Sequence, residues 1–99
     1  MNLSDNEMII LQKFFAAKPV KKAYLFGSYA RNEADKNSDI DLLVELDYSK
    51  HIGLGFVQMY LDLEDILHRK VDLVSDDSLS KYIRPYVDKE KILIYERAA

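Results

Sequence analysis

Three aspartates stand where they could bind a divalent cation. Asp39 and Asp41 are two residues apart in a stretch that alternates polar and apolar residues. In a strand their side chains therefore lie on one face, about 6 to 7 Å apart along the chain. Asp72 interrupts a short apolar run in which an aspartate has poor strand propensity and needs a partner. If the two strands are neighbours, the three carboxylates form an oxygen-rich cluster that suits Mg²⁺ and not zinc.

Electrostatic repulsion between the carboxylates is a reason to expect a cation in such a cluster. Two carboxylates about 4 Å apart at an effective dielectric near 20 repel by roughly 4 kcal/mol, and an intervening divalent cation reverses that cost. An isolated pair of aspartates at this spacing also fits an exposed edge strand that binds nothing. Asp72 favours the cation site, because it supplies a third carboxylate from another part of the chain.

A second candidate feature is the dipeptide Gly27-Ser28, placed where a predicted strand turns into a helix. Backbone N–H groups and the helix dipole favour phosphate at such a turn. The dipeptide alone also occurs in many turns without a ligand. Arg31 follows on the same turn, where it either reaches a phosphate oxygen or is only solvated.

The elements that must position these residues are predicted from capping signals and hydrophobic periodicity. A capping box at Ser4–Glu7, with Leu3 stapled against Met8, starts a first helix. Ser28 is expected to cap a short helix, and Pro85 to kink or divide the last helical region near Arg84. We expect strands over 20–26, 39–46, 70–74 and 92–96, and further helices over 29–33, 53–67 and 78–89.

The predicted order of elements describes a small α+β domain with one sheet and helices packed against it. With 99 residues, 48% of them hydrophobic, the chain is long enough for one core, and it contains no repeat or linker. We therefore expect a single domain over residues 1–99. In the strand that begins at Asp39, Ile40, Leu42 and Val44 are expected on the buried face and the aspartates on the opposite one.

Composition excludes several classes of protein. Without cysteine the chain has no disulfide framework and no thiolate metal site. No apolar run approaches the ~20 residues of a membrane span, and the N-terminal residues lack the pattern of a signal peptide, so we expect a cytoplasmic protein. A net charge of -3 argues against a dedicated nucleic-acid binder, because such binding needs many clustered cations.

The spacing of these motifs carries a family resemblance. Gly27-Ser28, ten further residues and then Asp39-Ile40-Asp41 resemble the signature of the DNA polymerase β-like nucleotidyltransferase superfamily. Within that superfamily nearly the whole chain is similar to the minimal nucleotidyltransferases (MNT), from GSYARNEADKNSDIDLLVEL through RKVDLV to EKILIYE. It departs from their usual pattern at Asn32 and His68, where relatives commonly have glycine, and His68 is expected to end its helix in a left-handed conformation.

The resemblance implies a polymerase β-like α+β fold with a mixed sheet and assigns roles to the residues already singled out. Gly27 and Ser28 would hold nucleotide phosphates. Asp39, Asp41 and Asp72 would hold Mg²⁺, as two ions about 3.5 to 4 Å apart that activate an attacking hydroxyl and stabilise the departing pyrophosphate. Asp72 would also accept the proton of that hydroxyl, and the substrate would be ATP.

The resemblance further implies a partner and leaves alternatives. Related MNT proteins are antitoxins that attach AMP to a tyrosine of a HEPN-family ribonuclease toxin. The competing interpretations are a binding module that masks its partner without catalysis, and transfer to a small molecule, for which a homodimer would have to supply the acceptor site. The sequence leaves the oligomeric state open, although an exposed apolar part of Ile83, Tyr86 and Val87 could serve as an interface. Tyr82, Tyr86 and Tyr95 are assigned first to the core.

Overall fold

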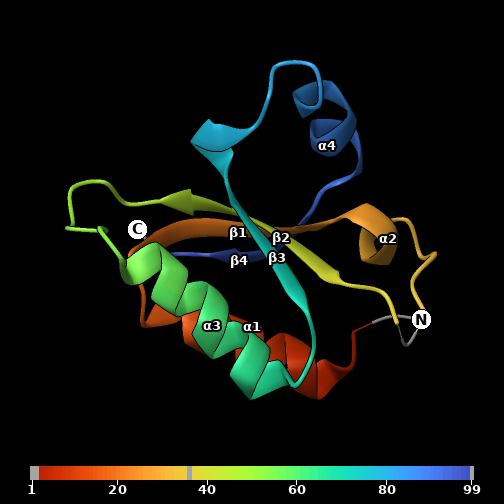
Figure 1. The fold of residues 1–99 in the computed structure, drawn as a ribbon, viewed down its shortest axis with the longest axis horizontal. Coiled ribbons are helices and arrows are strands. Elements are labelled where there is room, and N and C mark those ends of the chain that lie inside the picture. Colours follow the sequence, from red (N-terminus) through yellow and green to blue (C-terminus); the bar gives the residue numbers. More distant parts are fainter. Residues whose placement is uncertain (1–2, 36, 99) are drawn as a thin grey trace.

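The computed structural model describes residues 3–35 and 37–98 around one four-stranded sheet (Figure 1). In space the strand order is β3-β2-β1-β4, so β3 and β4 are the two edges. β2 pairs with β3 in parallel, and the other two pairings are antiparallel, which confirms the expected mixed sheet. The strands are β1 Val20–Phe26, β2 Ile40–Leu46, β3 Val71–Ser75 and β4 Ile92–Glu96.

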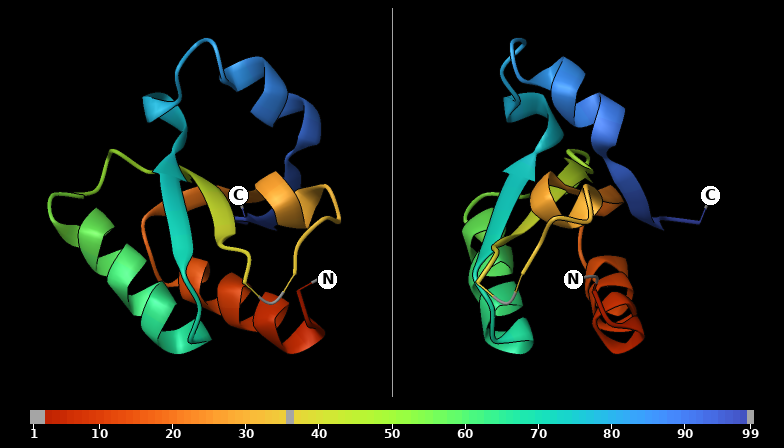
Figure 2. Two further views of the ribbon diagram at one scale, coloured as in Figure 1. Left: turned by 45° about the vertical axis from the view of Figure 1, so that its right-hand side comes forward. Right: turned by 90° about the vertical axis from the view of Figure 1, so that its right-hand side faces the viewer.

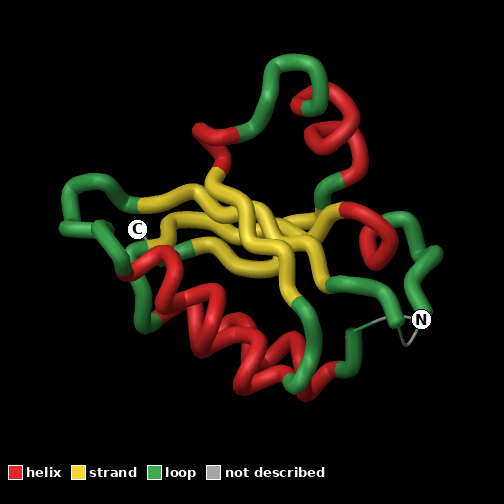
Figure 3. The backbone as a smooth tube through the Cα atoms, in the orientation of Figure 1, coloured by secondary structure: helices red, strands yellow, loops and turns green. Residues whose placement is uncertain are grey.

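The helices divide between the two sides of the sheet (Figures 1 and 2). The two long helices, α1 and α3, lie side by side on one face, and α4 stands on the other side, joined to β3 through a short 3₁₀ helix, η1. A loop separates η1 from α4 (Figure 3). The helices are α1 Asp5–Ala16, α2 Gly27–Ala30, α3 Gly55–Leu67, η1 Asp76–Ser78 and α4 Arg84–Glu90.

The main core lies between the sheet and the pair α1 and α3. Ile40, Leu42 and Val44 of β2 are fully buried there, as the alternation predicts. Leu43, predicted to face outward with the aspartates, is also fully buried. The prediction is wrong at this position because η1 and α4 stand over the other side of the sheet, where Val87 is buried as well (Figure 1).

The capping box at the start of α1 is present. Ser4 Oγ accepts the Glu7 N–H at 3.0 Å, and Glu7 Oε1 accepts the Ser4 N–H at 3.0 Å. Both bonds satisfy N–H groups that the first turn of a helix leaves without intrahelical partners. The helix then buries Leu11 and Phe15 against the sheet.

Two local predictions need correction. Helix α2 starts at Gly27, whose carbonyl accepts the Arg31 N–H at 3.1 Å, so Ser28 lies inside the helix and does not cap it. The single helical region expected over 78–89 is replaced by η1, an extended Leu79 and a helix that begins at Arg84. Pro85 explains that start, because proline is tolerated in the first turn and breaks a helix elsewhere.

Positions with left-handed backbone match the departures seen in the sequence. His68 ends α3 with φ 54°, as expected, and Asn32 has φ 59°.

In α4 the prediction for Val87 is wrong, since it is buried rather than part of an exposed apolar surface. The assignment of Tyr82 and Tyr86 to the core is also wrong, since they are 76% and 74% exposed, whereas Tyr95 packs against the core. Within the described residues no helix has the length and apolar character that crossing a membrane requires.

Candidate active site

The parallel pairing of β2 and β3 brings two of the three predicted aspartates together. Asp41 and Asp72 are direct partners in the register, and the Ile40 N–H donates to the Lys70 carbonyl at 3.0 Å where the pairing begins. Neighbouring strands lie about 4.8 Å apart, and paired residues of a parallel ladder point to the same face. The strand adjacency on which the predicted cluster depends is therefore present.

Gly27 meets the same cluster from β1. Phe26, the last residue of β1, pairs with Asp41, and the next residue, Gly27, turns the chain with φ 72°. A β-carbon at position 27 would overlap the carboxylate of Asp41. Glycine is required here for two reasons: the left-handed backbone, and the close approach of a carboxylate to the turn.

Burial and neighbouring charges act strongly on Asp41. The pKa of its carboxyl is raised from 3.8 to about 6, first by burial and then by the negative charges of Asp72 and Asp39. Arg31 opposes this shift, and Glu90 adds to it. Three acidic side chains and one cation thus act on Asp41, so negative charge is in excess around it. Such an excess is a feature of sites that bind cations or perform catalysis.

Asp39 lies just before β2 and is exposed, as is Asp72. Both line a groove of about 480 Å³ between the β3 edge and α3, where Tyr60 and Glu64 form the opposite wall. Glu64 also accepts the Val71 N–H at 3.0 Å, which fixes α3 to the start of β3. The groove gives Asp39 and Asp72 an open approach from solvent on the side of α3.

The residues present fit a hard divalent cation by their chemistry. All three carry carboxylates, they come from β2, β3 and the residue before β2, and the charge excess at Asp41 is the kind that a cation relieves. Their oxygens do not converge on one point, since no three acidic or imidazole side chains of residues 3–35 and 37–98 are grouped closely enough to hold one ion.

Arg31 is not merely solvated. Its Nε donates to Glu33 at 2.6 Å, and its Nη1 donates to both carboxylate oxygens of Glu90, at 3.2 and 3.1 Å. The Gly27 N–H donates to the same Glu90 carboxylate at 3.1 Å. Two of the three residues that the sequence assigns to phosphate binding, Gly27 and Arg31, are therefore held by one acidic side chain from α4.

Sequence reasoning missed Glu90 and Arg69. Glu90 begins the stretch EKILIYE, which contributes to the family resemblance but suggests no role. Arg69 follows the left-handed His68, lies over the ring of Tyr29 at 5.0 Å and pairs with Glu7 at 3.5 Å. It thereby ties α1 and the turn after α3 to the short helix that carries Ser28. No local pattern predicts either contact, because each joins residues about 60 positions apart.

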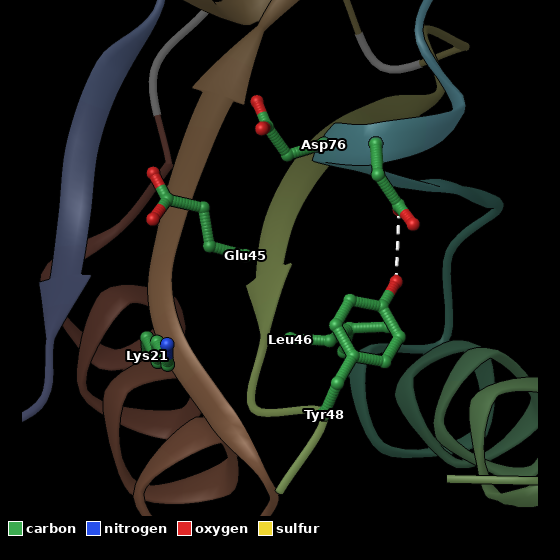
Figure 4. Close-up of a pocket in the computed structure, with 6 residues that line it drawn as sticks. Lys21, Glu45, Leu46, Tyr48 and Asp76 are labelled. Atoms are coloured by element: carbon green, nitrogen blue, oxygen red, sulfur yellow. Dashed lines mark hydrogen bonds between the residues drawn. The ribbon is translucent and has the colours of Figure 1, made fainter.

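A second acidic region lies at the other end of β2. Lys21, Glu45, Tyr48 and Asp76 are among the residues that line a cavity of about 160 Å³ there (Figure 4). Tyr48 Oη donates to Asp77 at 2.8 Å, shown by the dashed line in Figure 4. The acids of this region have hydrogen-bond donors, and the Gly27 turn is at the opposite end of the strand.

Aspartates beside a tight turn at the end of a strand are suited to nucleotidyl transfer, and comparison with known proteins agrees. A family model described as "Polymerase beta, Nucleotidyltransferase" matches residues 10–99. The chain belongs to the polymerase beta nucleotidyltransferase family. The predicted fold class and enzyme class are thereby confirmed.

Relatives of this nucleotidyltransferase carry a more specific name. Protein adenylyltransferase MntA of Thermococcus cleftensis is 36% identical over 75 residues, which are 76% of this chain and 75% of that protein. A protein of Methanocaldococcus jannaschii classed by name among the protein adenylyltransferases is 40% identical over 95 residues, or 94% of this chain and 89% of that one.

Solved structures resemble the nucleotidyltransferase over most of its length. A toxin–antitoxin structure with AMP-PNP superposes with a TM-score of 0.73 at 26% identity, covering 95% of this chain and 74% of that chain. A structure described as that of a minimal nucleotidyltransferase gives a TM-score of 0.63 at 34% identity, covering 88% and 85%. A tri-AMPylated HEPN toxin of Shewanella oneidensis in complex with its MNT antitoxin gives 0.70 at 21% identity, a likeness of fold, covering 95% and 73%.

Proposed function

We propose that this nucleotidyltransferase is an antitoxin that transfers AMP from ATP, with Mg²⁺, to a tyrosine of a HEPN-family toxin. The observation that carries the chemistry is the register of β2 with β3, which sets Asp41 beside Asp72 and next to the Gly27 turn. The names of the relatives support adenylyl transfer to a protein, and the toxin–antitoxin structures support the partner.

Each residue of the cluster has a role in this proposal. Asp39, Asp41 and Asp72 would hold Mg²⁺, which neutralises charge on the phosphates when it is bound. Gly27 and Ser28 would place the phosphates at the end of β1, close to Asp41. Asp72 would accept the proton of the attacking tyrosine hydroxyl, and its exposure leaves it open to an acceptor that arrives from solvent.

The shape of the site favours a large acceptor. Asp39 and Asp72 line an open groove rather than a closed cavity, and the other lining residues come from only α3 and the β3 edge. A small molecule in this groove would remain largely solvated, whereas a protein that covers the groove would exclude water itself. The groove therefore supports a protein acceptor over an aminoglycoside-like one.

The test uses the protein with ATP, Mg²⁺ and a helical ribonuclease-like protein encoded beside it. Intact-mass spectrometry should show the partner gaining one or more adenylates, and Asp39→Ala or Asp41→Ala should abolish the gain. Asp77→Asn is the matched control, since it removes one carboxylate from the other acidic region. No adduct from the unaltered protein would refute the proposal.

Transfer and masking are separated by a second measurement. A double variant with Asp39→Ala and Asp41→Ala is expressed together with the toxin at ordinary levels. If transfer is the mechanism, the cells are no longer protected. Full protection by this variant would instead support a non-catalytic antitoxin that neutralises its partner by direct binding.

A further inference from the structure

We propose that Glu90 is an internal anion that occupies the phosphate position of the Gly27 turn, so that ATP binds only after displacing it. The inference rests on the proposed function, because it takes Gly27 and Arg31 as groups that receive the nucleotide's phosphates. It adds a residue that regulates access to the site.

The contacts of Glu90 are those expected of a bound phosphate oxygen pair. Its Oε1 accepts the Gly27 N–H at 3.1 Å, and its two oxygens accept Arg31 Nη1 at 3.2 and 3.1 Å. Carboxylate and phosphate oxygens accept hydrogen bonds from the same donors, with similar geometry and charge assistance. The two anions therefore cannot use the Gly27 N–H and this edge of Arg31 at the same time.

The charges around Arg31 indicate that Glu90 competes with a triphosphate for this site and does not assist its binding. Arg31 is bound by Glu33 on one side and Glu90 on the other, so its positive charge is more than compensated. Asp41, on the next strand, adds a further negative charge. An incoming triphosphate would meet a net negative surface, and it gains the donors only when the Glu90 carboxylate leaves.

The two acidic residues that pair with Arg31 differ in side-chain exposure and in their distance from it along the chain. The Glu33 side chain is 63% exposed and lies two residues from Arg31, as in an ordinary surface ion pair. The Glu90 side chain is 24% exposed and comes from 63 positions beyond Gly27. Glu90 therefore contacts both donors of the turn, whereas Glu33 contacts one, which makes Glu33 a matched control.

The position of Glu90 in its own helix does not explain why an acidic residue stands there. Glu90 is the last residue of α4, where the partial negative charge of the helix end disfavours an anion. Among residues 3–35 and 37–98, the hydrogen bonds of its carboxylate all come from Gly27 and Arg31. Removing the carboxylate should therefore loosen the contact between α4 and the turn while it frees the donors for a ligand.

This arrangement gives two states, with Glu90 either on the turn or in solvent, and only the second binds phosphate. The apparent affinity for ATP is reduced by the fraction of molecules in the second state. If about one molecule in ten is open, removing the competing charge tightens ATP binding on the order of tenfold. The Arg31 side chain is 48% exposed, so a phosphate can approach it from solvent once Glu90 has moved.

The experiment measures the dissociation constant of ATP by calorimetry, once with EDTA and once with Mg²⁺, together with the midpoint of thermal unfolding. For Glu90→Gln we expect ATP to bind on the order of tenfold tighter in both buffers and the midpoint to fall. For Glu33→Gln we expect an ATP affinity within about twofold of the unaltered protein. Opposite signs for affinity and stability are specific to competition, because a residue that only supports the turn would lower both.

Affinity that is unchanged or weaker in Glu90→Gln overturns the inference. Should that variant fail to fold, Glu90→Asp replaces it, since the shorter side chain keeps the charge but withdraws it from Gly27, and a smaller gain is expected. A gain in affinity without any AMP transfer to the partner would refute the proposed function and leave the role of Glu90 standing. AMP transfer to the partner with an unchanged ATP affinity in Glu90→Gln would refute the role of Glu90 and leave the proposed function standing. No ATP binding by any variant would overturn both the role of Glu90 and the proposed function.

Discussion

The protein has two acidic regions, at opposite ends of β2, and they differ in what surrounds the carboxylates. At one end Asp47 accepts Arg97 at 2.8 Å and the Ser49 backbone N–H at 3.0 Å. Hydrogen bonds from Ser49 and Arg97 hold the pKa of Asp47 well below its ordinary value. At the other end the pKa of Asp41 is raised to about 6 by burial and by its acidic neighbours.

The comparison separates acids that stabilise the fold from acids kept for a ligand. In the region of Asp47, Asp76 and Asp77, each acid has a partner that lies within hydrogen-bond distance. Across residues 3–35 and 37–98, no side chain or backbone group donates a hydrogen bond to the carboxylates of Asp39, Asp41 or Asp72. The burial and the acidic neighbours that raise the pKa of Asp41 make its ionised form unfavourable in the folded protein, so we infer that these aspartates are retained for a cation.

The largest difference between the regions should appear in activity. We expect Asp41→Asn to lower the rate of AMP transfer by roughly a hundredfold or more, because the charge that would hold the cation is lost. Asp47→Asn should leave the rate within about threefold, since Asp47 is at the far end of β2. Single-turnover transfer measured by mass spectrometry compares the two. Equal losses would show that the difference in pairing has no bearing on catalysis.

A second prediction displaces the Asp41 carboxylate without removing any charge, and so tests whether its position beside the Gly27 turn matters. Gly27→Ala requires a left-handed alanine and overlaps the Asp41 carboxylate, so we expect a loss of stability of about 1 to 3 kcal/mol together with lower activity. Chemical denaturation measures the first effect.

Gly55→Ala is the matched control for that substitution. Gly55 is the first residue of α3, and an added β-carbon there meets no heavy atom within 4 Å. Its stability should stay the same or rise slightly, because alanine loses less backbone entropy in a helix. If both alanine variants behaved alike, the close approach of Asp41 to the turn would not matter.

The smallest expected effect concerns stability alone, at the end of β2 where the acids are paired. Because the pKa of Asp47 is lowered in the folded state from 3.8, its ionised form stabilises the fold above about pH 4, and that contribution is lost as the pH falls through the folded value. Asp47→Asn should therefore lower the unfolding midpoint at pH 7, and its difference from the unaltered protein should shrink in acid.

The exposed Asp65→Asn serves as the reference for that pH series. Asp65 lies on the solvent side of α3, where a charge change is expected to have little effect on the midpoint at any pH. Thermal unfolding followed by circular dichroism between pH 2 and pH 7 makes the comparison. A midpoint difference for Asp47→Asn that stayed constant across this range would contradict the assignment.

Much of this arrangement could be predicted from local patterns. The capping box at Ser4, the end of β1 at Gly27, the burial of Ile40 and Leu42, and the left-handed His68 each follow from a signal within a few residues. The pairing that brings Asp72 beside Asp41 was only a condition of the prediction, since strand order is not encoded locally.

What the sequence did not reveal depends on contacts between distant segments. The burial of Leu43 and Val87 requires knowing that η1 and α4 stand over the second face of the sheet. Ser28 was predicted to cap a helix, but Gly27 already begins it. The role of Glu90 is visible only once α4 is placed against the Gly27 turn.

The most direct test of the central claim, that Asp39, Asp41 and Asp72 are retained to hold a divalent cation, is the shift of the unfolding midpoint with Mg²⁺. A ligand that binds only the folded state raises the midpoint as its concentration increases. We predict such a rise for the unaltered protein and for Asp47→Asn, and none for Asp41→Asn. A rise in Asp41→Asn equal to that of the unaltered protein would contradict the claim.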